Sequence, residues 1–411
     1  MQEITLRNSA EANRRDLQAA LDRGGEIAVT GPGTFEVAGT LRIAGGTKLV
    51  FAPGVILRRT DGNGLHFLEN RGAETGERDR GITVEGLHLE VGDCDLRRDL
   101  PHPGWRGQLM LLHVEDLVLR NFICTDVGEY GYAVLISAFR NVLVENVRIE
   151  GKKDGVHFGP GRDLVLRNGV FRTWDDPVAL NAYDYYSSSP EFGWIENALV
   201  ENCTELPAAP GTPMMGYFCR LLGGGWGEWR RGMQIQRSDL AVHEGRLYSC
   251  GLAAGDVRAS TVPPTHETGV AEAGGIPWRR VAGPAVRDAG CRNITFRNIR
   301  LQKDRPCAFG AIYDWNRFGR SIYPDSPLPV FDRIVFEDIR VEAAIPKFLA
   351  LWAACRKLEV RDSDLRGGVI EVRAAPGVSG PYPSDPPEIV LSGNVGGPPE
   401  IRDSRGGGSR I

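Results

Sequence analysis

The chain has 411 residues, of which 25% are charged, and its formal net charge is −4. This balance excludes the strongly basic surface typical of nucleic-acid-binding proteins. No apolar run approaches the ~18 residues that a membrane-spanning helix needs, and the N-terminal residues lack the apolar segment of a signal peptide. We therefore expect no nucleic-acid or membrane partner. Localisation stays open between the cytoplasm and secretion with a removed leader, and so does the oligomeric state.

The first stretch of the chain predicts a helix from Ser9 to Arg23. Ser9 can cap its first turn, the pair beginning at Gly24 stops it, and Leu17 and Leu21 lie on one apolar face. Short strands broken by Gly and Pro follow. A helix in this place suits a cap over the open end of a repeat structure, whose first unit otherwise leaves apolar surface and strand edges bare.

A repeat then runs along the chain, in which aliphatic residues flank an Asn or Asp. The repeated positions are Asn121, Asn146, Asn168, Asn202, Asn298, Asp338 and Asp362. Asn and Asp tolerate left-handed backbone geometry, so they suit a corner between strands, and stacked at one corner they can form a side-chain ladder. A period of 22 to 25 residues in the middle of the chain predicts an all-β solenoid in which each repeat is one coil.

We expect one solenoid domain over residues 1–397, with the cap at 1–26 and a disordered tail at 398–411. Residues 204–290 predict a loop-rich insertion, which could also hold one or two further coils. The eight cysteines are scattered without a CxxC pair, which favours small apolar fillers over a metal site or disulfides.

Two consecutive copies of the repeat carry three aspartates. A shift of 22 residues places Asp154 on Asp176 and Val156 on Val178, with Asp175 beside them. Neighbouring coils are about 4.8 Å apart, so the carboxylates should lie close together. Such groups repel unless they share protons, bind a cation or do chemistry. Turn-forming Asp at solenoid corners and carboxylates holding Ca²⁺ are the alternatives.

The segment from Lys152 to Asn181 resembles the polygalacturonases of glycoside hydrolase family twenty-eight, and the glycine-rich strands near the N-terminus resemble the capping region of pectin-lyase-like solenoids. Asp154-Gly and the Asp175–Asp176 pair match the family motif, whereas its Gly-His-Gly and Arg-Ile-Lys motifs are missing. The resemblance implies a single-stranded right-handed parallel β-helix, no cofactor, and hydrolysis by single displacement with inversion. It implies Asp175 as the general acid, and Asp154 and Asp176 as the groups that hold and deprotonate water.

Because two motifs are missing, we expect a carbohydrate substrate other than polygalacturonate. Alternation along the strand could point His157 towards the substrate side, where it would replace the missing histidine, or leave it as a packed histidine. Lys153 could neutralise the aspartates. The candidate substrate-binding residues are His157, Asn181, Tyr183, Asp184, Trp226 and Lys153.

The sequence therefore predicts a glycoside hydrolase that cleaves a glycosidic bond in a plant or microbial polysaccharide or oligosaccharide. The first alternative is a polysaccharide lyase on the same fold, which uses Ca²⁺ or a basic residue beside a uronate carboxylate. The second is a carbohydrate-binding solenoid without catalysis.

Overall fold

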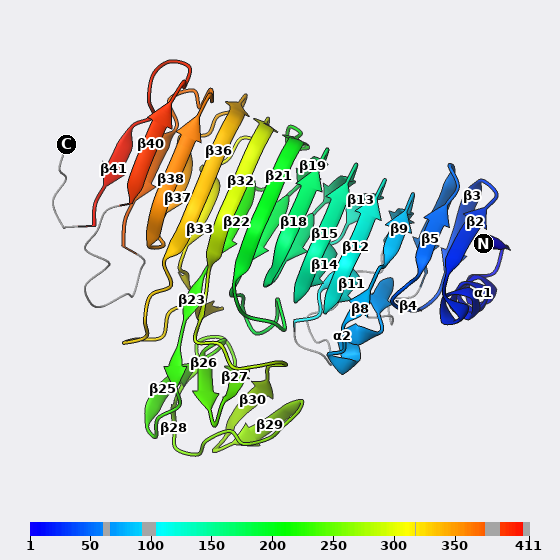
Figure 1. The fold of residues 1–411 in the computed structure, drawn as a ribbon, viewed down its shortest axis with the longest axis horizontal. Coiled ribbons are helices and arrows are strands. Elements are labelled where there is room, and N and C mark those ends of the chain that lie inside the picture. Colours follow the sequence, from blue (N-terminus) through cyan, green and yellow to red (C-terminus); the bar gives the residue numbers. More distant parts are fainter. Residues whose placement is uncertain (61–65, 93–103, 317, 375–386, 406–411) are drawn as a thin grey trace.

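The computed structural model describes residues 1–60, 66–92, 104–316, 318–374 and 387–405. In these residues the chain winds into a right-handed parallel β-helix, with the N-terminus at one end of the stack and the last strands at the other (Figure 1). Neither helix in the described part has the length and apolarity to span a bilayer. The predicted fold class is confirmed.

One parallel sheet, which we call the site sheet, has eleven strands in the described residues. Its strands are β4 (Leu41–Ile43), β7 (Leu68–Asn70), β11 (Gly107–Leu112), β14 (Tyr132–Ser137), β17 (Val156–Phe158), β20 (Val178–Asn181), β22 (Cys219–Leu222), β33 (Cys307–Ile312), β37 (Lys347–Leu351), β39 (Val369–Val372) and β41 (Ile401–Asp403). Each strand pairs in parallel with the strand of the next coil, so equivalent positions of successive coils stack.

The other walls form a second sheet, bent at a corner, with nineteen strands in the described residues. Before the corner lie β9 (Thr83–Glu85), β12 (Val114–Arg120), β15 (Phe139–Glu145), β18 (Gly161–Arg167), β38 (Cys355–Arg361) and β40 (Glu388–Ser392). After it lie β10 (His88–Glu90), β13 (Ile123–Val127), β16 (Arg148–Gly151) and β19 (Val170–Thr173). Three strands run through the corner: β21 (Ile195–Glu205), β32 (Cys291–Leu301) and β36 (Phe331–Val341). The N-terminal strands are β1 (Gln2–Thr5), β2 (Glu26–Thr30), β3 (Gly33–Val37), β5 (Lys48–Phe51), β6 (Val55–Arg59) and β8 (Asp79–Arg80).

The corner itself is the predicted ladder of Asn and Asp. All seven repeated positions have a left-handed backbone, with φ between 50° and 57°. The side-chain amide of Asn146 donates to Asn121 at 3.1 Å, and that of Asn168 donates to Asn146 at 2.9 Å. The same bond joins Asn298 to Asn202 at 2.8 Å. Because a side-chain amide both donates and accepts, the Asn of one coil can hydrogen-bond to the Asn of the next.

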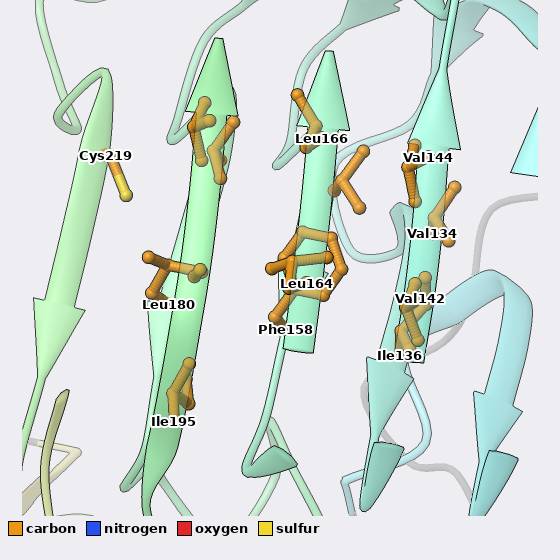
Figure 2. Close-up of a cluster of buried hydrophobic side chains, with 14 of the residues drawn as sticks. Val134, Ile136, Val142, Val144, Phe158, Leu164, Leu166, Leu180, Ile195 and Cys219 are labelled. Carbon is orange, nitrogen blue, oxygen red and sulfur yellow. The ribbon is translucent and has the colours of Figure 1, made fainter. Parts of the chain in front are cut away.

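The core fills the inside of the coils. Val134 and Ile136 of β14 gather with Val142 and Val144 of β15 in one buried cluster, to which Phe158 of the next coil also belongs (Figure 2). Alternation along each strand sends these aliphatic side chains inward and leaves the intervening positions for the outer surface. Seven described cysteines are buried and unpaired, as expected of apolar fillers.

The N-terminal helix is present as α1 (Ala10–Arg23), and a short second helix, α2, spans Gly72–Thr75. Ser9 accepts a hydrogen bond from Ala12 N–H, and Gly24 ends α1 at φ 68°. Leu17 and Leu21 are buried, and α1 packs against β3 and β4. The helix therefore covers the first coil, as its apolar face predicts.

The long segment between Asn202 and Asn298 adds no coil, because β21 pairs directly with β32. It leaves the stack after β22 and forms a mainly antiparallel unit beside the solenoid (Figure 1). Its strands are β23 (Gly224–Gly225), β24 (Gly227–Glu228), β25 (Met233–Gln236), β26 (Leu240–His243), β27 (Arg246–Cys250), β28 (Val257–Ser260), β29 (Val270–Ala273), β30 (Ile276–Arg280) and β31 (Asp288–Ala289). A further hairpin joins β34 (Trp315–Asn316) and β35 (Gly319–Arg320).

The C-terminal end differs from the expectation of a disordered tail from residue 398. Residues Ile401–Asp403 form β41, which pairs in parallel with β39 and closes the site sheet. Main-chain pairing explains this order, since the open edge of the last coil offers unpaired donors and acceptors. Residues 406–411 lie outside the described residues.

Candidate functional site

The predicted register of the two aspartate repeats is confirmed in the site sheet. Val156 of β17 pairs with Val178 of β20, and Phe158 pairs with Leu180. The backbone N–H of Gly155 donates to the carbonyl of Asp176 at 3.0 Å, so the segments before the two strands also stack. Asp154 thus lies one coil from Asp176, on the side of the sheet away from the core.

Lys153 brings two of the carboxylates together. Its ammonium lies 3.4 Å from Asp154 Oδ1 and donates a short hydrogen bond to Asp175 Oδ2. The side chains of Lys153 and Asp175 are 19% and 18% exposed, whereas Asp154 is almost fully buried. Burial alone would raise the pKa of Asp154, but Lys153, His157 and Arg220 hold it well below its usual range.

Asp176 experiences the opposite environment. It is buried, and burial together with the charge of Asp175 raises its pKa to about 7, although Arg220 lies 3.5 Å from its Oδ2. The backbone N–H of Tyr217 donates to its Oδ1 at 2.7 Å. Two stacked carboxyls therefore differ in charge near neutral pH, with Asp154 ionised and Asp176 able to hold a proton. Pairs with divergent pKa values are typical of acid–base sites.

His157 lies between two carboxylates. Its Nδ1 is 2.9 Å from Asp154 Oδ2, and its Nε2 is 2.7 Å from Asp184 Oδ2. The Asn181 amide donates to the same Asp184 oxygen at 2.8 Å. All these side chains are buried. His157 therefore points away from the core, as the alternation allowed, but other residues cover it.

Arg220 of β22 completes the group. Its Nε lies 3.4 Å from Asn181 Oδ1, and the arginine is in register with Ala179, itself in register with His157. Anionic and cationic side chains thus alternate around the site, with Asn181 linking Arg220 to Asp184. Lys153, Asp154, Asp175, Asp176, His157, Asn181 and Asp184 come together here.

The backbone around the Asp175–Asp176 pair is held from below and above. The buried Lys303 donates to the carbonyls of Thr173 and Trp174, both at 2.7 Å. Above the pair, an added Cβ at Gly216 would lie 2.8 Å from Asp175 Oδ1 and 2.9 Å from Asp176 Oδ1. Only glycine fits this approach, so the loop before β22 closes directly over both carboxyls.

Two expected sugar-binding residues are not placed to bind. Trp226 is 1% exposed and packs against Phe192, and its indole N–H donates to Val286 O at 2.6 Å. Tyr183 is also buried, with its hydroxyl directed to the carbonyls of Ser238 and Arg320. Both expectations are corrected: these side chains fix the insertion to the solenoid, because aromatic surface near an insertion is buried wherever the two parts meet.

Sequence reasoning missed several groups of the site. Tyr132 covers His157 with its ring 4.2 Å away and nearly parallel, at 7°. Tyr185 donates to Asp314, and the Asn316 amide donates to the Tyr185 hydroxyl at 2.7 Å. Tyr132 could have been found from the 22-residue shift, which places it on Asp154. Asp314 and Asn316 follow a later coil and carry no motif.

Among the described residues, no three His, Cys, Asp or Glu side chains converge as metal ligands. The Lys153 ammonium contacts both Asp154 and Asp175, at the position where two carboxylates would otherwise share a cation. The arrangement therefore balances its charge with protein side chains.

No family model and no curated protein matches the sequence. Two solved structures are similar in fold. A family 28 exopolygalacturonase of Yersinia enterocolitica is 13% identical with a TM-score of 0.51, over 98% of this chain and 78% of that one. The surface protein and adhesin PfbA of Streptococcus pneumoniae is also 13% identical with a TM-score of 0.51, over 94% of each chain. At these identities the likeness concerns the parallel β-helix fold, which carries both an enzyme and an adhesin.

Proposed function

We propose that the protein is a glycoside hydrolase that acts on a carbohydrate through Asp154, Asp175 and Asp176. The observation that carries the proposal is the stacked pair Asp154 and Asp176, whose pKa values are moved in opposite directions by their surroundings. A hydrolase of this kind needs one carboxylate to activate water and one carboxylic acid to protonate the leaving oxygen. Mere adhesion does not need like charges packed at adjacent coils.

In this proposal Asp154 is the base, because the cations around it keep it ionised. The proton for the leaving group comes from the adjacent pair Asp175 and Asp176. Asp176 holds that proton near neutral pH, and Asp175 is the member of the pair that reaches the surface. This division differs from the one implied by the family resemblance, where Asp154 and Asp176 act together on water.

The lyase alternative is less well supported by the basic residues present. A lyase base must be neutral to abstract a proton, yet Lys153 lies between two carboxylates. Burial would lower the pKa of Lys153, but Asp154 and Asp175 outweigh burial and raise it. Arg220 faces Asp176, and an arginine does not lose its proton in proteins.

A binding protein without catalysis is the second candidate, favoured by one observation. Asp154 and Asp176 are each only 2% exposed, so substrate reaches them only if Asp175, Lys153 or the loop at Gly216 moves. In that alternative the buried carboxylates would serve charge balance alone.

A substrate panel separates these functions. Pectic, arabinogalactan and aryl-glycoside substrates are incubated with the wild type and with Asp154→Asn, Asp175→Asn and Asp176→Asn, and new reducing ends and unsaturated products are measured. Reducing ends that all three variants lose support the hydrolase. Unsaturated products favour a lyase, and carbohydrate binding that survives all three changes without turnover favours the binding protein.

A further inference from the structure

The His157 ring is buried and surrounded by polar groups from several coils. One face of the ring stacks on Tyr132 of β14, and His157 is in register with Ala179 of the next coil. The groups that face it are Asp154 and Lys153 before β17, Asn181 in β20, Asp184 after β20, Tyr132 in β14 and Arg220 in β22. The Arg106 guanidinium also lies over the Tyr132 ring, 5.1 Å from its centroid.

Hydrogen-bond chemistry decides the state of this ring. Each ring nitrogen is within 3 Å of a carboxylate oxygen, and an ionised carboxylate only accepts hydrogen bonds. A neutral imidazole has one N–H, so it would leave one nitrogen lone pair against a lone pair of Asp154 or Asp184. Two N–H donors satisfy both contacts, and the parallel Tyr132 ring offers a π-face to the resulting cation.

We propose that His157 is a positioning residue, an imidazolium at neutral pH that fixes Asp154 between itself and Lys153 and does not touch substrate. The inference rests on the proposed function, since it gives Asp154 the task of activating water. It replaces the expectation from sequence that His157 binds the sugar.

Asp184, the second carboxylate bonded to His157, is held in place, and this lets His157 orient Asp154. Asp184 Oδ2 accepts from both His157 and Asn181, and Asp184 Oδ1 accepts from the Tyr185 backbone N–H at 2.8 Å. Asp184 therefore cannot turn without breaking three hydrogen bonds. Through His157, this rigid anchor sets the rotation of the Asp154 carboxylate.

The two oxygens of Asp154 then have different roles. Oδ2 accepts from His157, whereas Oδ1 is buried and, within the described part of the chain, accepts no hydrogen bond. Its nearest cation is Lys153 Nζ at 3.4 Å. A buried oxygen with free lone pairs is the atom that can accept a proton from an attacking water. The hydrogen bond from His157 to Oδ2 thus orients Oδ1 towards the attacking water.

The expected pH behaviour follows from the same contacts. Burial would lower the pKa of His157, but the hydrogen bonds to Asp154 and Asp184 raise it above 6.5. A raised histidine pKa contributes stability fully below pH 6.5, and this contribution is lost as pH rises through the folded-state pKa. The positioning of Asp154 should be lost over the same alkaline range.

The protonation state can be measured directly by ¹⁵N NMR of the histidine rings, with the His157 signals assigned by their loss in His157→Gln. We expect both ring nitrogens to carry protons at pH 7 and the titration midpoint to lie above that of an ordinary histidine. Asp184→Asn should lower the midpoint by about one unit or more, because one acceptor becomes neutral. A single neutral tautomer at pH 7, or a midpoint that ignores Asp184→Asn, would overturn the proposal. If His157→Gln does not fold, the His157 signals are assigned by elimination, with the other six histidines substituted one at a time.

Kinetics separate positioning from binding. On the best substrate of the panel, His157→Gln should lower kcat about a hundredfold with KM nearly unchanged, because the base is displaced while the sugar contacts remain. His243→Gln in the insertion is the matched control and should retain wild-type kcat. A raised KM at unchanged kcat would make His157 a binding residue. The NMR experiment needs no substrate. If no substrate is turned over, the proposed hydrolase function fails, while the protonation state of His157 is still tested.

Discussion

The corner ladder and the aspartate site both stack like side chains on successive coils, yet they solve the stacking differently. At the corner, the Asn146 amide donates to Asn121 and the Asn168 amide donates to Asn146, so the same neutral group stacks on itself from coil to coil. In the site, Asp154 stacks one coil from Asp176, and carboxylates cannot bond to each other unless one holds a proton. Here Lys153 lies against Asp154, Arg220 lies against Asp176, and Asp176 is able to hold a proton. The comparison teaches that a candidate site in a repeat fold is found where the stacked side chains are charged and cannot satisfy one another.

The largest expected effect comes from removing the charge of Asp154. Asp154→Asn should lower kcat/KM about a thousandfold, because an amide cannot take a proton from water. Steady-state kinetics on the best panel substrate measure this. Asp163→Asn is the matched control: Asp163 belongs to an outer ladder, where it accepts from Asn197 at 2.9 Å, and should keep full activity. Comparable activity in both variants would exclude Asp154 as the base.

The pH profile tests the other half of the pair. Burial and Asp175 raise the pKa of Asp176 to about 7, so its proton is lost as pH rises past that value. We expect kcat/KM to fall about tenfold per unit on the alkaline side. A profile that stays flat between pH 7 and 9 would place the proton donor elsewhere.

Lys153 tests the need for a cation in the site. Lys153→Met leaves Asp154 and Asp175 without their shared ammonium and should lower the free energy of unfolding by about 2 kcal/mol at pH 7, a value reduced for partial exposure. Denaturant unfolding measures it. The loss should shrink at acidic pH, where the carboxyls become protonated. Its neighbour Lys152 pairs with Glu129 at the surface, and Lys152→Met should change stability by less than about 0.5 kcal/mol.

Substitutions in the corner ladder should change stability according to the backbone geometry and should not change activity. Asn146 has φ 53° and bonds to Asn121 and Asn168. Asn146→Ala should cost about 1–2 kcal/mol, from left-handed strain and lost hydrogen bonds. Asn146→Gly should cost less, because glycine tolerates this backbone. Equal losses in the two variants would show that backbone strain contributes nothing.

The last expected change in stability has the opposite sign. Asp176→Asn should lower activity and yet raise the free energy of unfolding by about 1 kcal/mol at pH 8. Because the pKa of Asp176 is raised in the folded state, its ionisation disfavours folding. This cost grows as pH rises from the ordinary pKa of an aspartate to about 7. An amide does not ionise. Destabilisation at every pH would show that the attraction between Arg220 and the Asp176 carboxylate exceeds the cost of burying that charge.

Local patterns predicted much of the fold and of the site. The cap helix, the coil repeat, the αL corner and the stacking of Asp154 on Asp176 all follow from short-range rules: capping, alternation and a fixed shift of 22 residues. The exceptions, Trp226 and Tyr183, lie where the insertion packs on the solenoid. Their burial depends on a contact between distant segments that no local period encodes.

By itself, the sequence determined that Asp154 and Asp176 share a column, because the repeat length between these two coils is 22 residues and the flanking aliphatic residues match at that shift. Only the tertiary structure decided their electrical surroundings. Lys153 and His157 come from one coil and Arg220 from another two coils further on, while Asp184 and Gly216 approach from loops. Burial and the distance to each cation set the charge of a carboxyl, and both are properties of the folded chain.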